Sequence, residues 1–87
     1  MSSGTPRDLY LRHLTVDEAL YRLDQYLNDA FMAGHWQVRV VHGKGQGIIR
    51  DVVWKALAKH PLVKSYRLGL PGEGSEGATV VELEQRR

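Results

Sequence analysis

A histidine, a lysine and three glycines stand together where a run of valines ends, within residues 38–53. His42 can exchange a proton near neutral pH, and Lys44 adds a positive charge. Glycine lets the backbone approach a ligand closely and adopt positive φ. The glycines of this stretch are Gly43, Gly45 and Gly47. These residue types are typical of a site that binds a phosphate group and transfers a proton beside it.

The elements on either side of this loop favour the same interpretation. The residues before His42 have the pattern of a buried strand, and those after Gly47 have the pattern of an amphipathic helix. In such a unit the loop lies over the carboxyl end of the strand, where the first unpaired N–H groups of the helix also point. Their partial positive charge attracts anions. We expect this loop to be the working site.

The glycine spacing argues against two nucleotide-binding motifs. The loop reads G-x-G-x-G, which differs from the dinucleotide fingerprint G-x-G-x-x-G, and the chain contains no G-x-x-x-x-G-K-[ST] sequence. The sequence therefore points to a phosphate group outside these two cofactor classes.

Basic residues gather around the loop, although the net charge is only +2. Between His35 and Arg67, seven basic residues stand against one acid, Asp51. The seven are Arg39, Lys44, Arg50, Lys55, Lys59, Lys64 and Arg67. This asymmetry favours a polyanionic partner, and the alternative is a solvated basic helix face.

The length of 87 residues predicts one small domain. We expect residues 1–6 to be a disordered leader or linker, residues 7–84 to be the domain and residues 85–87 to be a tail. Without cysteine the chain has no disulfide and no thiolate metal site, which fits the cytoplasm. No run approaches the roughly 18 apolar residues of a membrane span, so no membrane partner is expected.

The periodicity predicts two helices and four strands. Residues 8–12 alternate as a strand does, and Thr15 and Glu18 form a capping box at which a helix begins and runs toward Gly34. The later elements are a strand at Gln37–Val41, a helix at Gly47–Lys59, a strand at Val63–Leu70, an exposed and mobile loop at Pro71–Gly77, and a strand at Ala78–Leu83. Trp54 either covers the edge of the core or stacks on a nucleic-acid base.

The order β-α-β-α-β-β predicts a two-layer α/β sandwich, with a four-stranded mixed sheet and both helices on one face. The final strand should be antiparallel to its predecessor. Because the ends of the first two parallel strands lie side by side, we expect Arg12 and His13 to come near His42 and Lys44.

Three segments give the chain a specific resemblance to the Smr (small MutS-related) domain. They are Val41–Gly47 with its H-G-x-G motif, His60–Arg67, and Pro71–Leu83 with its G-x-T-x-V-x-L ending. The resemblance covers Leu9–Leu83 and is greatest to the domain at the C-terminus of the second bacterial MutS paralogue. It implies the fold of the C-terminal domain of translation initiation factor three, and nicking or cleavage of DNA or RNA.

The resemblance gives the candidate residues their roles. His42 would move a proton, while Lys44 and Arg12 would stabilise the charge that grows on the phosphate; alternatively, His42 caps local backbone groups. The residues expected to contact nucleic acid are Tyr10, His13, Arg39, Gly43, Gly45, Gln46, Gly47, Arg50 and Lys55. Mg²⁺ or Mn²⁺ is a candidate cofactor, with no ligand residue assigned.

The chain departs from the family at its first motif. L-D-x-[HR]-G appears here as Leu9-Tyr10-Leu11-Arg12-His13, so Tyr10 replaces an aspartate that is often given a catalytic or metal-positioning role. One predicted function is a nuclease that nicks branched or supercoiled DNA, joined to MutS-like ATPase domains and acting in recombination control. The alternatives are RNA cleavage on the ribosome in translation rescue, and a binding module without catalysis.

Overall fold

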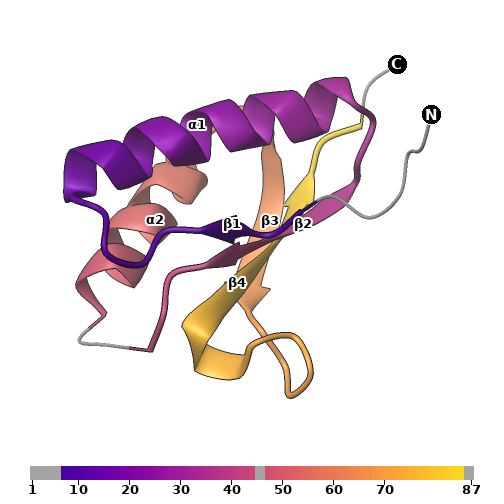
Figure 1. The fold of residues 1–87 in the computed structure, drawn as a ribbon. Coiled ribbons are helices and arrows are strands. Elements are labelled where there is room, and N and C mark those ends of the chain that lie inside the picture. Colours follow the sequence, from indigo (N-terminus) through magenta and orange to yellow (C-terminus); the bar gives the residue numbers. More distant parts are fainter. Residues whose placement is uncertain (1–6, 45–46, 86–87) are drawn as a thin grey trace.

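A computed structural model describes residues 7–44 and 47–85, which form a four-stranded sheet with two helices on one face (Figure 1). The elements in chain order are β1 (Leu9–Tyr10), α1 (Val16–Met32), β2 (Gln37–Val41), α2 (Ile48–Lys59), β3 (Val63–Leu68), the 3₁₀ turn η1 (Ser75–Gly77) and β4 (Ala78–Leu83). The predicted fold class and element order are confirmed. The predicted leader, residues 1–6, lies outside the described residues, as do residues 86–87 of the predicted tail.

The last strand lies inside the sheet, because the strand order is β1-β2-β4-β3. β1 pairs with β2 in parallel, and β4 is antiparallel to both of its neighbours. The prediction of an antiparallel β3–β4 pair is confirmed, whereas the position of β4 between β2 and β3 was not predicted. Hydrophobic periodicity identifies a strand and its buried face, but it carries no information on lateral order.

Local sequence signals explain where α1 begins and ends. The Glu18 N–H donates to Thr15 Oγ1 at 3.1 Å, and the Thr15 N–H donates to Glu18 Oε1 at 3.0 Å. This confirms the predicted capping box. Past the other end of the helix Gly34 has a φ of +86°, in the left-handed region that favours glycine.

Helix α2 begins and ends beside residues that cannot extend it. Gly47 is its N-cap with a φ of +82°, and His60, which precedes Pro61, is extended with a ψ of 126°. The His60 Nε2 atom lies 2.9 Å from Asp24 Oδ1, which ties the end of α2 to α1. In the part of the chain that the structure describes, neither helix is long and apolar enough to span a bilayer.

One hydrophobic core lies between the helices and the sheet. It consists of Leu11, Ala19, Leu23, Leu27, Ala30, Val38, Val40, Val53, Leu57, Val81 and Leu83. The apolar stripes of both helices pack against alternate residues of the strands, as a two-layer fold requires.

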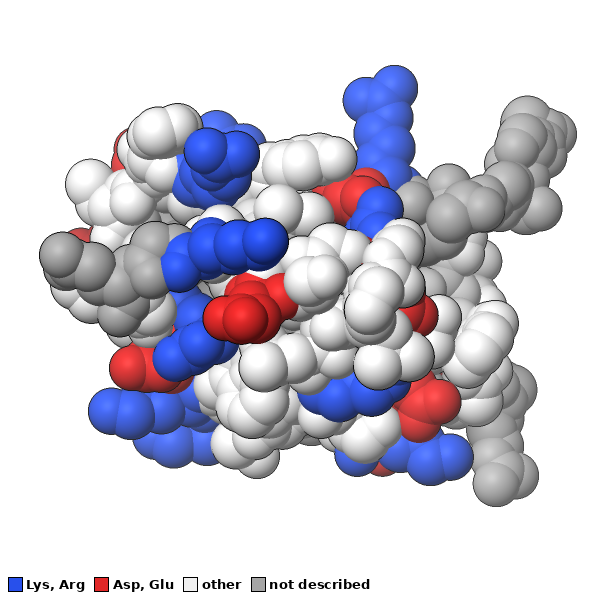
Figure 2. Space-filling view, turned by 90° about the horizontal axis from the view of Figure 1, so that it is seen from below, with Lys and Arg blue, Asp and Glu red and all other residues white. Residues whose placement is uncertain are grey.

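The other face of the sheet carries charged pairs in place of a second helical layer. Arg39 and Arg67 are the register partners of Val80 on either side, and Val80 is only 4% exposed. Arg39 Nε donates to Asp8 Oδ2 at 3.0 Å, and Arg67 Nη1 donates to Glu73 Oε1 at 2.8 Å. Figure 2, seen from the side opposite α1, shows side chains of both signs on this face.

The segment between β3 and β4 is more firmly attached than the sequence predicts. Glu73 accepts hydrogen bonds from both Arg67 and the Leu70 N–H. Gly77, at the end of the segment, is buried and its carbonyl bonds to the start of the loop after β2. The prediction of a fully exposed loop is therefore wrong at Gly77. Hydrogen bonds to a distant segment bury it, and local composition does not reveal them.

Candidate nucleic-acid interface

Arg12 and Lys44 lie on either side of the contact between Gly43 and Gly77, at one end of the sheet. The pairing of β1 with β2 extends to Leu11, whose N–H donates to the Val41 carbonyl at 2.9 Å. Arg12 then lies across Gly43, because a Cβ added to Gly43 would stand 3.3 Å from Arg12 Cγ. Gly43 also has a φ of +88°, so both its backbone conformation and the close side chain favour glycine here.

The other side of this segment faces the residue that precedes β4. The Gly77 carbonyl accepts hydrogen bonds from the N–H groups of His42, at 3.0 Å, and Gly43, at 2.9 Å. A Cβ added to Gly77 would stand 3.3 Å from Lys44 Cγ, so the stem of Lys44 lies against Gly77. We call the surface formed by Arg12, Gly43, Lys44 and Gly77 the loop end. These contacts bring Arg12 to the glycine loop, as expected from the strand order.

His42 faces inward from the loop end, because only 6% of it is exposed. Its Nδ1 atom lies 3.0 Å from the Gly43 carbonyl oxygen, and its Nε2 atom lies 2.8 Å from Thr79 Oγ1. The indole Nε1 of Trp54 donates to the same Thr79 oxygen at 2.9 Å. Both ring nitrogens of His42 are thus occupied by groups of the protein itself.

The surroundings of His42 favour the neutral imidazole. Burial lowers the pKa of His42 below its ordinary value, and the positive charge of Arg50 acts in the same direction. The hydrogen bond to the Gly43 carbonyl acts in the opposite direction, but the net shift is downward. His42 therefore adds no positive charge to the loop end at neutral pH.

Trp54 belongs to the edge of the core. It is half-buried, and its ring meets that of Tyr66 edge to face, with 4.9 Å between centroids and 79° between planes. Its N–H is taken by Thr79. Of the two interpretations open at the sequence level, this placement favours the edge of the core over base stacking.

Helix α2 directs its first turn toward the same end of the sheet. Its N-cap, Gly47, provides no side-chain hydrogen bond to the first turn. The Arg50 side chain lies beside Gly47, where an added Cβ would stand 2.9 Å from Arg50 Nη2. Arg50 Nε is 3.7 Å from Asp51 Oδ1, a loose contact. A basic side chain and helical N–H groups thus lie next to the loop, as predicted.

Three other predicted contact residues lie in different environments, and Arg39 is not brought to the loop end, because its partner Asp8 precedes β1 whereas the loop end lies beyond β1. Tyr10 is 63% exposed and pairs with Val41 in the sheet. His13 is exposed and has a φ of +68°, at the position where the family motif has glycine. Arg39 lies on the open face of the sheet and is bound to Asp8. Gly45 and Gln46 lie outside the described residues.

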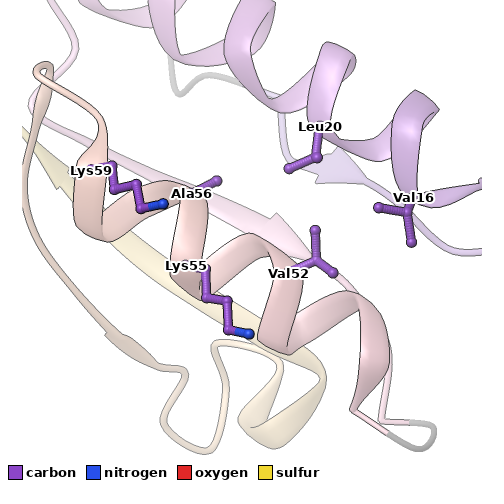
Figure 3. A pocket seen from close by; sticks show the side chains of 6 residues that line it. All are labelled: Val16, Leu20, Val52, Lys55, Ala56 and Lys59. Carbon is purple, nitrogen blue, oxygen red and sulfur yellow. The ribbon is translucent and has the colours of Figure 1, made fainter.

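Lys55 lies on a different surface from Arg50. Five residues along a helix correspond to a rotation of about 140°, and Lys55 accordingly lines a groove between α1 and α2 of about 330 Å³ (Figure 3). The groove is lined by Val16, Leu20, Val52, Lys55, Ala56 and Lys59. The structure therefore does not bring Lys55 to the loop end.

The charge of the surface agrees with this placement. In Figure 2, Lys and Arg side chains gather at the left of the view, the end at which Figure 1 places the connection between β2 and α2.

Within residues 7–44 and 47–85 no group of three or more histidines and carboxylates could hold a metal ion. The candidate cofactor Mg²⁺ or Mn²⁺ thus finds no ligand set among these residues.

The sequence prediction overlooked Thr79 and its hydrogen bonds with His42 and Trp54. Thr79 is fully buried and accepts or donates two hydrogen bonds, although it stands in a strand of otherwise mostly apolar residues. A single buried hydroxyl in such a strand requires a polar partner, and this signal was available from the sequence.

The family model described as the Smr domain matches residues 9–84. The chain belongs to the Smr domain family. This Smr domain is 53% identical over 74 residues to the protein called Endonuclease MutS2 from Clostridium beijerinckii. The aligned residues cover 85% of this chain and 9% of that protein. It is 48% identical over 73 residues to Endonuclease MutS2 from Caldicellulosiruptor saccharolyticus, again covering 9% of that protein. The chain thus spans about a tenth of the length of these relatives.

Two solved structures share the fold of this Smr domain. The crystal structure of the Smr domain of Thermus thermophilus MutS2 matches with a TM-score of 0.86 and 42% identity, covering 90% of this chain and 98% of that one. The structure of YdaL, a stand-alone small MutS-related protein from Escherichia coli, matches with a TM-score of 0.88 and 27% identity. It covers 94% of this chain and 67% of the YdaL chain.

Proposed function

We propose that this Smr domain binds the phosphate backbone of DNA at the loop end and nicks it, as part of a longer MutS-like protein that acts in recombination control. The observation that carries the proposal is the placement of Arg12 and Lys44 on either side of the Gly43–Gly77 contact. Two cations held within one small surface, beside the first turn of α2, fit a phosphate group. The names of the MutS2 relatives support cleavage as the activity.

Arg12 and Lys44 differ in what they can do for a phosphate. The guanidinium of Arg12 can donate two parallel hydrogen bonds, whereas the ammonium of Lys44 acts as a compact charge. Placed on a phosphodiester, both would stabilise the negative charge that develops as the leaving oxygen departs. Arg50 adds positive charge at the start of α2.

His42 lies below the surface of the loop end and contacts it through hydrogen bonds within the protein. Its ring is buried and both nitrogens are bonded, so it does not face a ligand at the loop end. The backbone N–H of His42 joins the loop to Gly77. We propose that His42 holds the loop in place, and a role as the proton carrier is the alternative outcome of the experiment below.

The experiment incubates the domain with supercoiled plasmid and, separately, with a labelled single-stranded RNA, each with and without Mg²⁺ or Mn²⁺. Arg12→Ala and Lys44→Ala should each lose cleavage and weaken binding together, whereas Lys59→Ala, which removes the same charge from the groove, should behave as the wild type. If His42→Ala abolishes cleavage while gel shifts show unchanged binding, His42 is the proton carrier. Cleavage of RNA alone would replace DNA as the substrate.

A binding module without chemistry is the second candidate, and Tyr10 is the observation that favours it. Tyr10 stands where the family has an aspartate, and its side chain is exposed beside the loop end. A phenol is a poor base at neutral pH. If only Tyr10→Asp cleaves, while the wild type binds in a salt-sensitive manner, this copy of the domain binds without cutting.

A further inference from the structure

We infer that Thr79 and Trp54 are positioning residues of the loop end, which hold the imidazole of His42 in the single tautomer that carries its hydrogen on Nδ1. Their effect on nucleic acid rests on the proposed function, because it is exerted through the loop that carries Lys44. Neither residue lies in the loop itself, since Trp54 is in α2 and Thr79 is in β4.

The tautomer follows from which atoms can donate. The Gly43 carbonyl oxygen only accepts, so its 3.0 Å contact with His42 Nδ1 requires a hydrogen on Nδ1. The Trp54 indole N–H only donates, so Thr79 Oγ1 accepts from it. The one hydrogen of the Thr79 hydroxyl then remains for His42 Nε2, at 2.8 Å. With neutral His42 protonated on Nδ1, each hydrogen in this series of three hydrogen bonds has one acceptor.

Burial prevents water from replacing these partners. Thr79 is 0% exposed and His42 is 6% exposed, and within the described residues no buried side-chain nitrogen or oxygen lacks a hydrogen-bond partner. A hydrogen on His42 Nε2 would point at the hydroxyl hydrogen of Thr79, which would have to turn away and lose its acceptor. The hydrogen bond from the Thr79 hydroxyl to Nε2 therefore opposes the second tautomer and the imidazolium alike. Arg50 is the charged group that acts on the ring, and it also opposes the imidazolium.

The ring orientation matters because it fixes the backbone that leads to Lys44. His42 Nδ1 binds the Gly43 carbonyl, while the N–H groups of both residues bind the Gly77 carbonyl. Hydrogen bonds thus fix both the N–H and the carbonyl of Gly43, the residue immediately before Lys44. Thr79 and Trp54 thus act on the cation through His42, although neither touches the ligand surface.

The test uses the whole ¹⁵N-labelled chain and records the ring nitrogens of His42 by long-range ¹H–¹⁵N correlation, with exposed His13 as the internal reference. Wild-type His42 should show a protonated Nδ1 and an unprotonated Nε2. Trp54→Phe removes the hydrogen bond that Thr79 Oγ1 accepts, which weakens the hydroxyl as a donor to His42 Nε2, so the Nε2 signal should move toward that of an unbonded nitrogen. Thr79→Val removes the donor to Nε2, so the Nε2 signal should move further toward that of an unbonded nitrogen while Nδ1 stays protonated, and Thr79→Ser, which keeps the hydroxyl, should restore the wild-type signals.

The same variants are titrated with a labelled oligonucleotide. Thr79→Val should bind about tenfold more weakly, which is the size expected when the displaced Lys44 loses one hydrogen bond to a phosphate. Thr79→Ser should regain the wild-type affinity. A wild-type His42 protonated on Nε2, or wild-type ring signals in both Trp54→Phe and Thr79→Val, would overturn the assignment. If the wild type binds no oligonucleotide, the proposed function fails while the ring nitrogens still decide the tautomer. Should Thr79→Val not fold, Trp54→Phe decides it.

Discussion

Gly74→Ala should destabilise the domain strongly, although the substitution adds a single methyl group. Gly74 has a φ of +101°, a region that costs a residue with a Cβ about 1–2 kcal/mol. The added Cβ would also stand 2.7 Å from the Cβ of Ala78, the first residue of β4, and relieving such a contact in a packed region costs about 1–3 kcal/mol. The two effects together predict a loss of about 2–5 kcal/mol in the free energy of unfolding.

The assay is thermal and urea denaturation followed by circular dichroism. For a domain of this size, each kcal/mol lowers the Tm by about 4–8 °C, so Gly74→Ala should melt at least about 8 °C below the wild type. The matched control is Gly77→Ala, three residues along the same segment. There φ lies outside the left-handed region, and the new Cβ would meet the flexible stem of Lys44 at 3.3 Å.

Gly77→Ala should therefore keep its stability to within about 1 kcal/mol, while it displaces Lys44 and weakens binding to an oligonucleotide. The two glycines thus separate an effect on folding from an effect on the loop end. If Gly74→Ala melts together with the wild type, the conformation of the segment before β4 is not the one described here.

Three further outcomes can be measured. Arg12→Ala and Lys44→Ala should each reduce the slope of log K against log salt by about one in fluorescence anisotropy with duplex DNA; an unchanged slope would mean that the residue contacts no phosphate. The Arg67 guanidinium lowers the pKa of Glu73 from 4.5 to about 2, so the stability it adds is complete above pH 4.5 and is lost as the pH falls toward 2. Urea midpoints of wild type and Glu73→Gln should therefore converge over that range, and a constant difference would contradict the pairing. Thr15→Ala should cost about 1 kcal/mol in urea denaturation because it removes the helix cap, and a stability equal to the wild type would show that the capping box contributes nothing.

The parts of the fold that sequence predicted are those that local chemistry determines. Thr15 and Glu18 stand three residues apart and can cap a helix whatever surrounds them. The end of α2 at His60 follows in the same way from Pro61. The meeting of Arg12 with Gly43 needed one more step, the parallel pairing of β1 with β2, which the intervening helix makes the favoured arrangement.

The parts that sequence missed depend on where β4 lies. Thr79 meets His42 and Trp54 only because β4 enters the sheet beside β2, and no local pattern encodes that neighbour. The attachment of Gly77 to residues 42 and 43 has the same origin. Lys55 shows the opposite limitation, since its charge suggested a phosphate contact while its position around α2 directs it into the groove.

The central position of β4 also has a consequence for the order in which the domain can form during synthesis. Until Ala78–Leu83 leaves the ribosome, β2 and β3 have no common neighbour, and the core lacks Val81 and Leu83. The contacts that complete the sheet and those that complete the loop end therefore arise in the same late step. A chain interrupted before β4 would carry Arg12 and Lys44 without the strand that holds their site together.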